Sequence, residues 1–201
     1  MPTGDLRERF SRQALLPGVG VEGQEKWAKA ALLLAGNGIS FEAAKTALVS
    51  AGAPKIQALD LNFTEQADPA DLWVVLGEKA SSLRLWSRLS RSRNQPALFG
   101  WPMATGPALF LFNPARGKCP CLECFEVMNP KNFNPGDPPT RRILGAMAAS
   151  EALQWLLKRE SPLETKVWVN SLESGVSFHH EVRPTPKCPA WLLEQGAKIT
   201  P

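Results

Sequence analysis

Short apolar runs alternate with longer amphipathic stretches along this chain, which is the order expected of an α/β protein. Runs of strand length predict β-strands at 31–35, 55–60, 72–76, 97–100, 108–112, 166–170 and 176–182. Helical spacing predicts helices over 22–30, 42–48, 81–91 and 141–158, with 6–16 helical or irregular. Because Leu72–Leu76 contains no polar residue, we expect that strand inside a parallel sheet. The last two strands are predicted to form an antiparallel hairpin with a turn at Ser174-Gly175.

Length and composition favour one α/β domain. The 201 residues are 44% hydrophobic, enough for one substantial core and too few for two ordinary domains. We therefore expect a single domain over 1–201, with an N-terminal helical arm at about 5–30. No run has signal-peptide or membrane-spanning character, so the expected location is cytoplasmic. The net charge of +4 does not by itself indicate nucleic-acid binding.

One stretch concentrates positive charge at helical spacing. Arg84, Arg88 and Arg91, followed by Arg93, occupy one side of the predicted helix 81–91, with leucines and a tryptophan on the other. This pattern is typical of a solvated helix face, and it also suits a docking surface for an acidic partner.

A glycine turn follows the first predicted strand. The sequence Gly36-Asn37-Gly38-Ile39-Ser40-Phe41 leads into a helix, in the order strand, turn, helix that cradles phosphate groups at a helix N-terminus. Such a turn needs small residues, because backbone N–H groups must come close to phosphate oxygens. Phe41 stands at the third glycine position, so its ring is predicted to exclude phosphate or close strand–helix packing.

The four cysteines are grouped in a way that favours a metal site over disulfides. Cys121 and Cys124 have the spacing of a zinc knuckle, and Cys188 can supply a third thiolate. The fourth ligand is predicted to be Cys119, with His179 and His180 as alternatives. Buried thiols without metal are the competing interpretation. A catalytic thiol is a weaker hypothesis, because no cysteine lies near a histidine in sequence.

Residues 8–26 resemble the opening of the ThiF/MoeB/HesA group of E1-like activating enzymes, in which an Arg-Tyr-Ser-Arg-Gln motif precedes a similar leucine, proline and glycine run. Later segments agree in order: the glycine turn, Asp60 after the second strand, Phe99-Gly100, the stretch 120–125 and Cys188-Pro189. The resemblance extends from about residue 7 to residue 191, with large pieces of the family pattern absent in the middle. It implies a Rossmann-like, mostly parallel sheet with flanking helices, C-terminal antiparallel strands and a zinc knuckle formed by 119–124 with 188.

The family resemblance also implies ATP-dependent adenylation of the C-terminal carboxylate of a ubiquitin-like or sulfur-carrier protein, usually by a dimer with a four-cysteine zinc site. By the same resemblance, Gly36 and Gly38 match the glycine motif, Asp60 matches a ribose-binding acid, and Glu78 falls at a magnesium-associated aspartate. Asp60 as a strand-ending turn residue and Glu78 in an exposed pair with Lys79 are the competing interpretations.

Several family features are missing from this sequence. Ile39 and Phe41 replace glycines, and Asn62 replaces a second aspartate. After Asn62 only eight residues, 63–70, precede Asp71 and the third predicted strand, where the family carries cationic residues that reach the triphosphate. The loop between the zinc knuckle and the helix at Arg141 contains no cysteine, so transfer through a cysteine there is not available.

One cation of the family pattern is retained near the N-terminus. The resemblance implies that Arg12, or Arg9, contacts ATP bound to the other subunit of a dimer. The alternative is that both arginines pair with acids near the N-terminus.

The sequence therefore predicts a degenerate E1-like subunit that does not adenylate and acts as a protein-binding partner, with structural zinc and no functional ATP and magnesium site. Its partner is expected to be a second copy or an intact E1-like subunit, with a ubiquitin-like carrier or peptide as a further candidate. An active adenylyltransferase with a remodelled pocket is the alternative. A nicotinamide-dependent oxidoreductase is a third hypothesis, which Phe41 disfavours.

Overall fold

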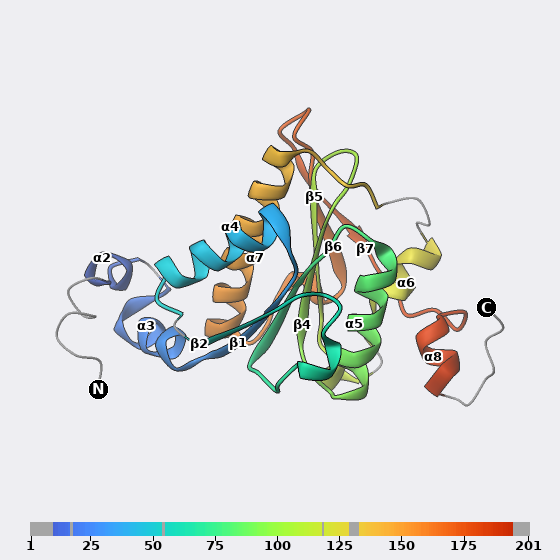
Figure 1. Ribbon diagram of the computed structural model, residues 1–201, viewed down its shortest axis with the longest axis horizontal. Helices are drawn as coiled ribbons and strands as arrows, with labels where there is room; N and C mark the ends of the chain where they lie inside the picture. Colours follow the sequence, from blue (N-terminus) through green and yellow to red (C-terminus); the bar gives the residue numbers. More distant parts are fainter. Residues whose placement is uncertain (1–9, 17, 54, 118, 129–132, 195–201) are drawn as a thin grey trace.

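The computed structural model describes residues 10–16, 18–53, 55–117, 119–128 and 133–194. Its centre is a seven-stranded sheet with the order β2-β1-β3-β4-β5-β6-β7 (Figure 1). The strands are β1 (Ala31–Ala35), β2 (Lys55–Leu59), β3 (Leu72–Leu76), β4 (Ala97–Pro102), β5 (Pro107–Phe112), β6 (Lys166–Asn170) and β7 (Ser177–Glu181). All seven strands predicted from the sequence are confirmed, with ends that differ by at most two residues.

The sheet is parallel in one half and antiparallel in the other. Strands β2, β1, β3 and β4 pair in parallel, whereas β4–β5, β5–β6 and β6–β7 pair antiparallel. The expectation of a mostly parallel sheet therefore holds for the first four strands alone. A tight turn at Met103–Gly106 joins β4 to β5, where each of these two residues donates its N–H to the other's carbonyl.

Two hydrophobic cores cover the two faces of the sheet because side chains alternate along each strand. Helices α3 (Gly20–Lys29), α4 (Gly38–Ser50) and α7 (Pro138–Lys158) lie on one face (Figure 1). Helices α5 (Ala80–Ser92), α6 (Leu122–Met128) and α8 (Pro189–Glu194) lie on the other. Along β3, Leu72, Val74 and Leu76 face the first group, and Trp73 and Val75 face the second.

Several helices differ from the sequence prediction, and α8 is one that was not predicted. Helix α4 begins at Gly38, so Phe41 lies in its first turn and not in a loop. Helix α7 begins three residues early, at Pro138, because two prolines fill positions that need no N–H donor and Asp137 caps the helix through Thr140 N at 2.8 Å. Helix α6 was not predicted. The N-terminal arm is described from residue 10, with a short helix α2 (Ser11–Ala14).

Candidate functional site

The strand order reverses between β1 and β3, and this point is where an open α/β sheet of this kind places a ligand. The chain runs from β1 outward to β2, then returns to β3 on the other side of β1. The carboxyl ends of β1, β2 and β3 are followed by Gly36, Asp60 and Gly77-Glu78. The structure thus brings the residues predicted for nucleotide binding to one edge of the sheet, which we call the switch-point edge (residues 36–41, 60–62 and 77–78).

Both retained glycines have structural reasons that involve no nucleotide. A Cβ on Gly36 would lie 2.8 Å from the carbonyl oxygen of Leu76, because the end of β3 approaches the turn closely. Gly38 has a φ of +68°, a backbone conformation that favours glycine, and a Cβ there would meet no atom within 4 Å. Because the fold itself accounts for Gly36 and Gly38, their presence is no evidence for phosphate binding.

Phe41 is a core residue that covers the glycine turn. Its side chain is 9% exposed and belongs to the core between the sheet and α7. The ring carbon Cδ2 lies 3.3 Å from the position that a Cβ on Gly36 would take. The ring therefore packs directly beside the turn, and its exclusion of phosphate stays a prediction.

Close packing at this edge occurs between two helices. A Cβ on Gly145 of α7 would lie 2.2 Å from the carbonyl oxygen of Ser40 in α4. The Cβ of Ala43 and the backbone nitrogen of Ala44 complete this contact. Helix α7 thereby holds the first turn of α4 in place.

Asp60 is hydrogen-bonded within its own chain. Oδ1 accepts from the backbone N–H and the side-chain amide of Asn62, at 2.9 and 2.8 Å, and Oδ2 accepts from Nδ2 of Asn37 at 3.1 Å. The backbone hydrogen bond from Asn62, followed by that from Asn37, lowers the pKa of Asp60. The carboxylate is thus ionised at neutral pH and serves as a turn residue, and its role toward ribose stays a prediction.

Glu78 forms an ion pair with α7. Its Oε1 lies 3.0 Å from Nε of Arg141, and the same Nε lies 2.8 Å from the carbonyl oxygen of Pro135. From the sequence, Lys79 was the expected partner of Glu78. The partner in the structure is Arg141, which lies at the end of β3 because α7 begins at Pro138. The magnesium role of Glu78 stays a prediction.

The short connection between β2 and β3 is hydrogen-bonded to β2, the edge strand of the sheet. Gln57 of β2 donates Nε2 to the carbonyl oxygen of Gln66 at 2.9 Å and to Asp68 at 2.8 Å, and its Oε1 accepts from Asp68 N at 3.0 Å. This connection contains the single helical turn η1 (Thr64–Gln66) and no lysine or arginine.

Three thiols form a compact buried cluster on the opposite face of the sheet. The Sγ atom of Cys121 lies 3.8 Å from that of Cys124 and 3.5 Å from that of Cys188. Sulfur ligands of tetrahedral zinc lie about 3.8 Å apart when each Zn–S bond is about 2.3 Å. The pKa of Cys124 is lowered because its thiolate accepts hydrogen bonds from Cys121 and Cys188. This three-thiol cluster can hold a metal ion.

Cys119 lies beside the cluster and does not belong to it. Its thiol contacts the carbonyl oxygen of Asn113 at 3.2 Å, and burial raises its pKa to about 11. His179 and His180 are exposed on β7, where His180 packs edge-on against Phe178. Among the residues that the structure describes, the ligand group therefore contains three of the predicted residues, and Cys119 as a fourth ligand stays a prediction.

The arginines of α5, and Arg93 directly after it, contact other residues of the same chain. Arg88 pairs with Glu123 at 2.6 Å and Arg84 with Glu126 at 3.4 Å, and both acids lie on α6. Arg91 lies over the ring of Phe112, and Arg93 donates to the carbonyl oxygen of Ala67. The acidic surface that this helix face binds is thus helix α6 of the same chain, which the sequence analysis missed because α6 itself was not predicted.

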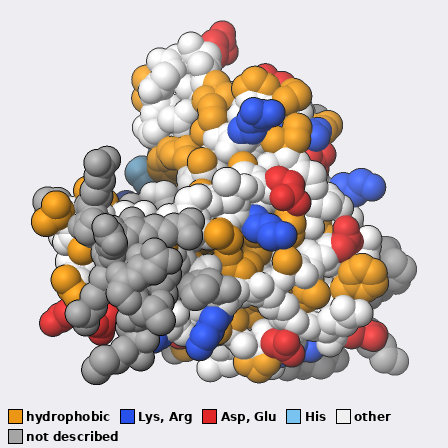
Figure 2. Space-filling model, turned by 60° about the vertical axis from the view of Figure 1, so that its left-hand side comes forward, with side chains coloured by type: hydrophobic (Ala, Val, Ile, Leu, Met, Phe, Trp, Pro, Cys, Tyr) orange, Lys and Arg blue, Asp and Glu red, His pale blue; other side chains and the backbone are white. Residues whose placement is uncertain are grey.

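The N-terminal arm carries exposed apolar side chains near Arg12. Leu15 is 83% exposed, Leu16 53% and Val21 61%. Figure 2 shows the side of the molecule formed by the N-terminal helices, where apolar side chains are interspersed with charged ones. Arg9 and the side chain of Arg12 lie outside the described residues.

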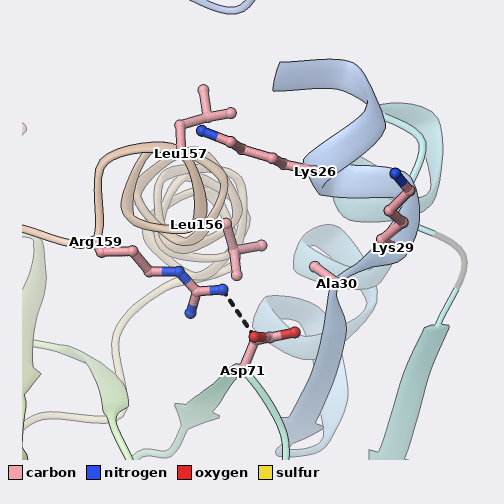
Figure 3. Close-up of a pocket in the computed structure, with 7 residues that line it drawn as sticks. All are labelled: Lys26, Lys29, Ala30, Asp71, Leu156, Leu157 and Arg159. Atoms are coloured by element: carbon pink, nitrogen blue, oxygen red, sulfur yellow. Dashed lines mark hydrogen bonds and ion pairs between the residues drawn. The ribbon is translucent and has the colours of Figure 1, made fainter. Parts of the chain in front are cut away.

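A cavity of about 310 Å³ opens at the other, amino-terminal edge of the strands (Figure 3). Its walls are the last turns of α3 and α7 with Asp71 between them: Lys26, Lys29, Ala30, Asp71, Leu156, Leu157 and Arg159. Arg159 Nη2 lies 2.8 Å from Asp71, whose other oxygen accepts from Ala31 N at 2.9 Å. The cations lie at helix C-termini, where they offset the helix dipoles, so this cavity has a structural explanation.

Comparisons with known proteins bear on the fold. No protein family and no curated protein matches the sequence. A crystal structure of Escherichia coli MccB with AMPCPP and MccA is similar, with a TM-score of 0.72 and 15% identity, over 93% of this chain and 75% of MccB. MccB with ATP gives a TM-score of 0.70 at 15% identity over the same shares. A heterocyclase in complex with substrate and cofactor gives 0.66 at 18% identity, over 92% of this chain and 31% of the heterocyclase.

These identities establish architecture and not activity. In the described parts of the chain no helix is long and apolar enough to span a membrane. The chain has the fold of MccB.

Proposed function

We propose that this protein is a non-adenylating member of the E1-like superfamily that acts through protein contacts. The observation that carries the proposal is that the polar and aromatic side chains at the switch-point edge have partners within the chain itself. Phe41 covers the glycine turn, and Arg141 pairs with Glu78 at the position expected to lie near magnesium. The connection between β2 and β3 supplies no cation for a triphosphate. A polyphosphate would therefore meet the Asp60 carboxylate and a Glu78 carboxylate that already occupies Arg141, with no further cation from this connection.

A nucleotide titration tests the non-adenylating assignment. Isothermal titration of ATP with Mg²⁺ into the protein is expected to give no saturable heat up to about 1 mM. MccB, which has been solved with ATP, is the positive control under the same conditions. Saturable micromolar binding to the wild-type protein would overturn the proposal.

An active adenylyltransferase remains the second candidate, because Asp60 is ionised at the end of β2 and the turn at Gly38 is open. Pyrophosphate exchange that depends on an added carrier protein or peptide would favour it. MccB, which has been solved with the peptide MccA, makes a peptide a reasonable candidate to add. Exchange is expected to be absent with each carrier tested.

The proposed protein contact includes the N-terminal arm. Exposed apolar residues lie there beside Arg12, which would reach a partner's nucleotide if the partner is an intact E1-like subunit. Light scattering is expected to report a dimer, and the double variant Leu15→Ser, Leu16→Ser is expected to weaken it. Val176→Ser, an equally exposed apolar residue in the β6–β7 turn, is the matched control. An arm variant that behaves like this control would contradict a contact through the arm.

We further propose a structural zinc ion held by Cys121, Cys124 and Cys188. The sulfur separations match a tetrahedral zinc site, and the thiolate-rich donor set suits this ion. Bound zinc would fasten α6 to the segment that precedes α8. Metal analysis is expected to give one zinc per chain.

A further inference from the structure

Glu123 is a buried carboxylate between two of the metal-binding cysteines. It lies in the first turn of α6, between Cys121 and Cys124, and its side chain is 1% exposed. Nε and Nη2 of Arg88 lie 2.6 and 3.0 Å from its two oxygens, a bidentate geometry that is among the strongest that ion pairs form. A carboxylate with so little solvent contact is costly unless it is paired.

Arg88 also lies within electrostatic reach of the thiols. The pKa of Arg88 is raised first by its hydrogen bond with Glu123 and further by the negative charge of Cys188 and Cys121. Helix α5 therefore places one cation beside both the carboxylate and the cluster. Glu123 and Cys124 lie in α6, Cys121 directly precedes that helix, and Cys188 directly precedes α8. None of these four side chains carries a positive charge.

Metal binding changes the charge balance of this region. Zinc binds thiolates, so the cysteines lose protons when the ion enters. Three thiolates and one Zn²⁺ carry a net charge of −1, and an unpaired Glu123 would add a second negative charge in a buried setting. With Arg88 paired to Glu123, the region with zinc bound carries a net charge of −1 and not −2.

We propose that Arg88 is a positioning and charge-balancing residue of the three-thiolate metal centre, and that it enables metal binding by neutralising the buried Glu123 carboxylate. This inference rests on the zinc site proposed above. The structure also offers a matched pair. The pair of Arg84 with Glu126 also joins α5 to α6, at 3.4 Å. This pair is not bidentate, and Glu126 lies outside the Cys121–Cys124 stretch.

The test measures zinc affinity by competition with a chromogenic chelator in four proteins: wild type, Arg88→Met, the double variant Arg88→Met with Glu123→Gln, and Arg84→Gln. Arg88→Met is expected to weaken zinc about 10- to 100-fold, the range seen when outer-shell partners of metal ligands are removed. The double variant is expected to regain most of that loss, because no charge is left unpaired. Arg84→Gln is expected to stay within about twofold of wild type.

Each other outcome overturns the inference. If the double variant binds as weakly as Arg88→Met, the pair is only a mechanical clamp. If Arg88→Met matches Arg84→Gln, Arg88 has no special role, whereas the zinc site itself stands. If the wild-type protein holds no zinc, the proposed metal centre fails and this inference with it. The cobalt-substituted proteins provide a second readout, because unchanged thiolate-to-metal absorption in the double variant shows that the three sulfurs still ligate.

Discussion

The switch-point edge and the three-thiol cluster differ in how well they keep the groups that a ligand would contact. At the switch-point edge the glycine turn keeps its shape, and the groups that would handle a nucleotide are replaced or paired internally. At the cluster three thiols keep a ligand geometry, although Trp191 stands where a fourth thiol would complete the pattern. A retained backbone motif is therefore weaker evidence for ligand chemistry than retained donor atoms at bonding separation.

The difference has a physical basis. A glycine turn serves the fold as well as a ligand, because β3 approaches Gly36 too closely for any side chain. Three buried thiols within 4.8 Å of one another place three soft donor atoms around one point, which is the arrangement that a thiophilic metal ion such as zinc uses.

The largest expected effect comes from the cluster. Cys188→Ser removes one of three thiolates, so we expect loss of zinc and a fall in the free energy of unfolding on the order of 5 kcal/mol, because a structural zinc contributes its binding energy to folding. Metal analysis and denaturant unfolding measure the two effects. Cys119→Ser is the control and is expected to keep its zinc, because the Cys119 thiol contacts Asn113 and not the cluster. Zinc loss in Cys119→Ser would make that residue the fourth ligand.

At the switch-point edge, Phe41→Ala tests whether the ring is part of the core. Removing a side chain that is 9% exposed is expected to cost about 3 kcal/mol of stability, with zinc content unchanged. Chemical denaturation measures the cost. A change below about 1 kcal/mol would mean that the ring is not packed as described.

The contact between α4 and α7 is tested by Gly145→Ala. The new Cβ would lie 2.2 Å from the Ser40 carbonyl oxygen, so α7 must shift, at a cost of about 2 kcal/mol. Ser150→Ala, at an exposed position of the same helix, is expected to change stability by less than about 0.5 kcal/mol. Equal effects in thermal unfolding would contradict the close approach of the two helices.

The smallest effect concerns Asp60. Its folded-state pKa is lowered, so its contribution to stability is present above the unfolded pKa of about 3.9 and is lost as pH falls through the folded value. The stability difference between wild type and Asp60→Asn is expected at neutral pH and is expected to vanish in acid. A difference that persists unchanged below about pH 3 would contradict this role.

Strands β1, β3, β4 and β5 were predictable because each is a short apolar run, whereas the mostly polar β7 was placed by the turn at Ser174-Gly175 before it. The two-faced cores follow from alternation along the strands. Helix α6 was missed because it spans only seven residues and begins within the cysteine motif, where a metal-binding turn was expected. The early start of α7 was missed because Pro138 and Pro139 were assigned to the preceding loop.

The predicted site residues could be placed at strand ends from the sequence, but their partners could not. The pairs of Glu78 with Arg141 and of Arg88 with Glu123 join residues 63 and 35 positions apart, and nothing in local spacing encodes them. The separation of Cys119 from the cluster likewise depends on how the chain turns at Asn113.

Titration of ATP with Mg²⁺ into the wild-type protein, followed by crystallisation with nucleotide, decides whether the switch-point edge binds a nucleotide. We expect no saturable heat and no nucleotide beside Gly36. Micromolar binding, with phosphate density between the glycine turn and the end of β3, would contradict this expectation.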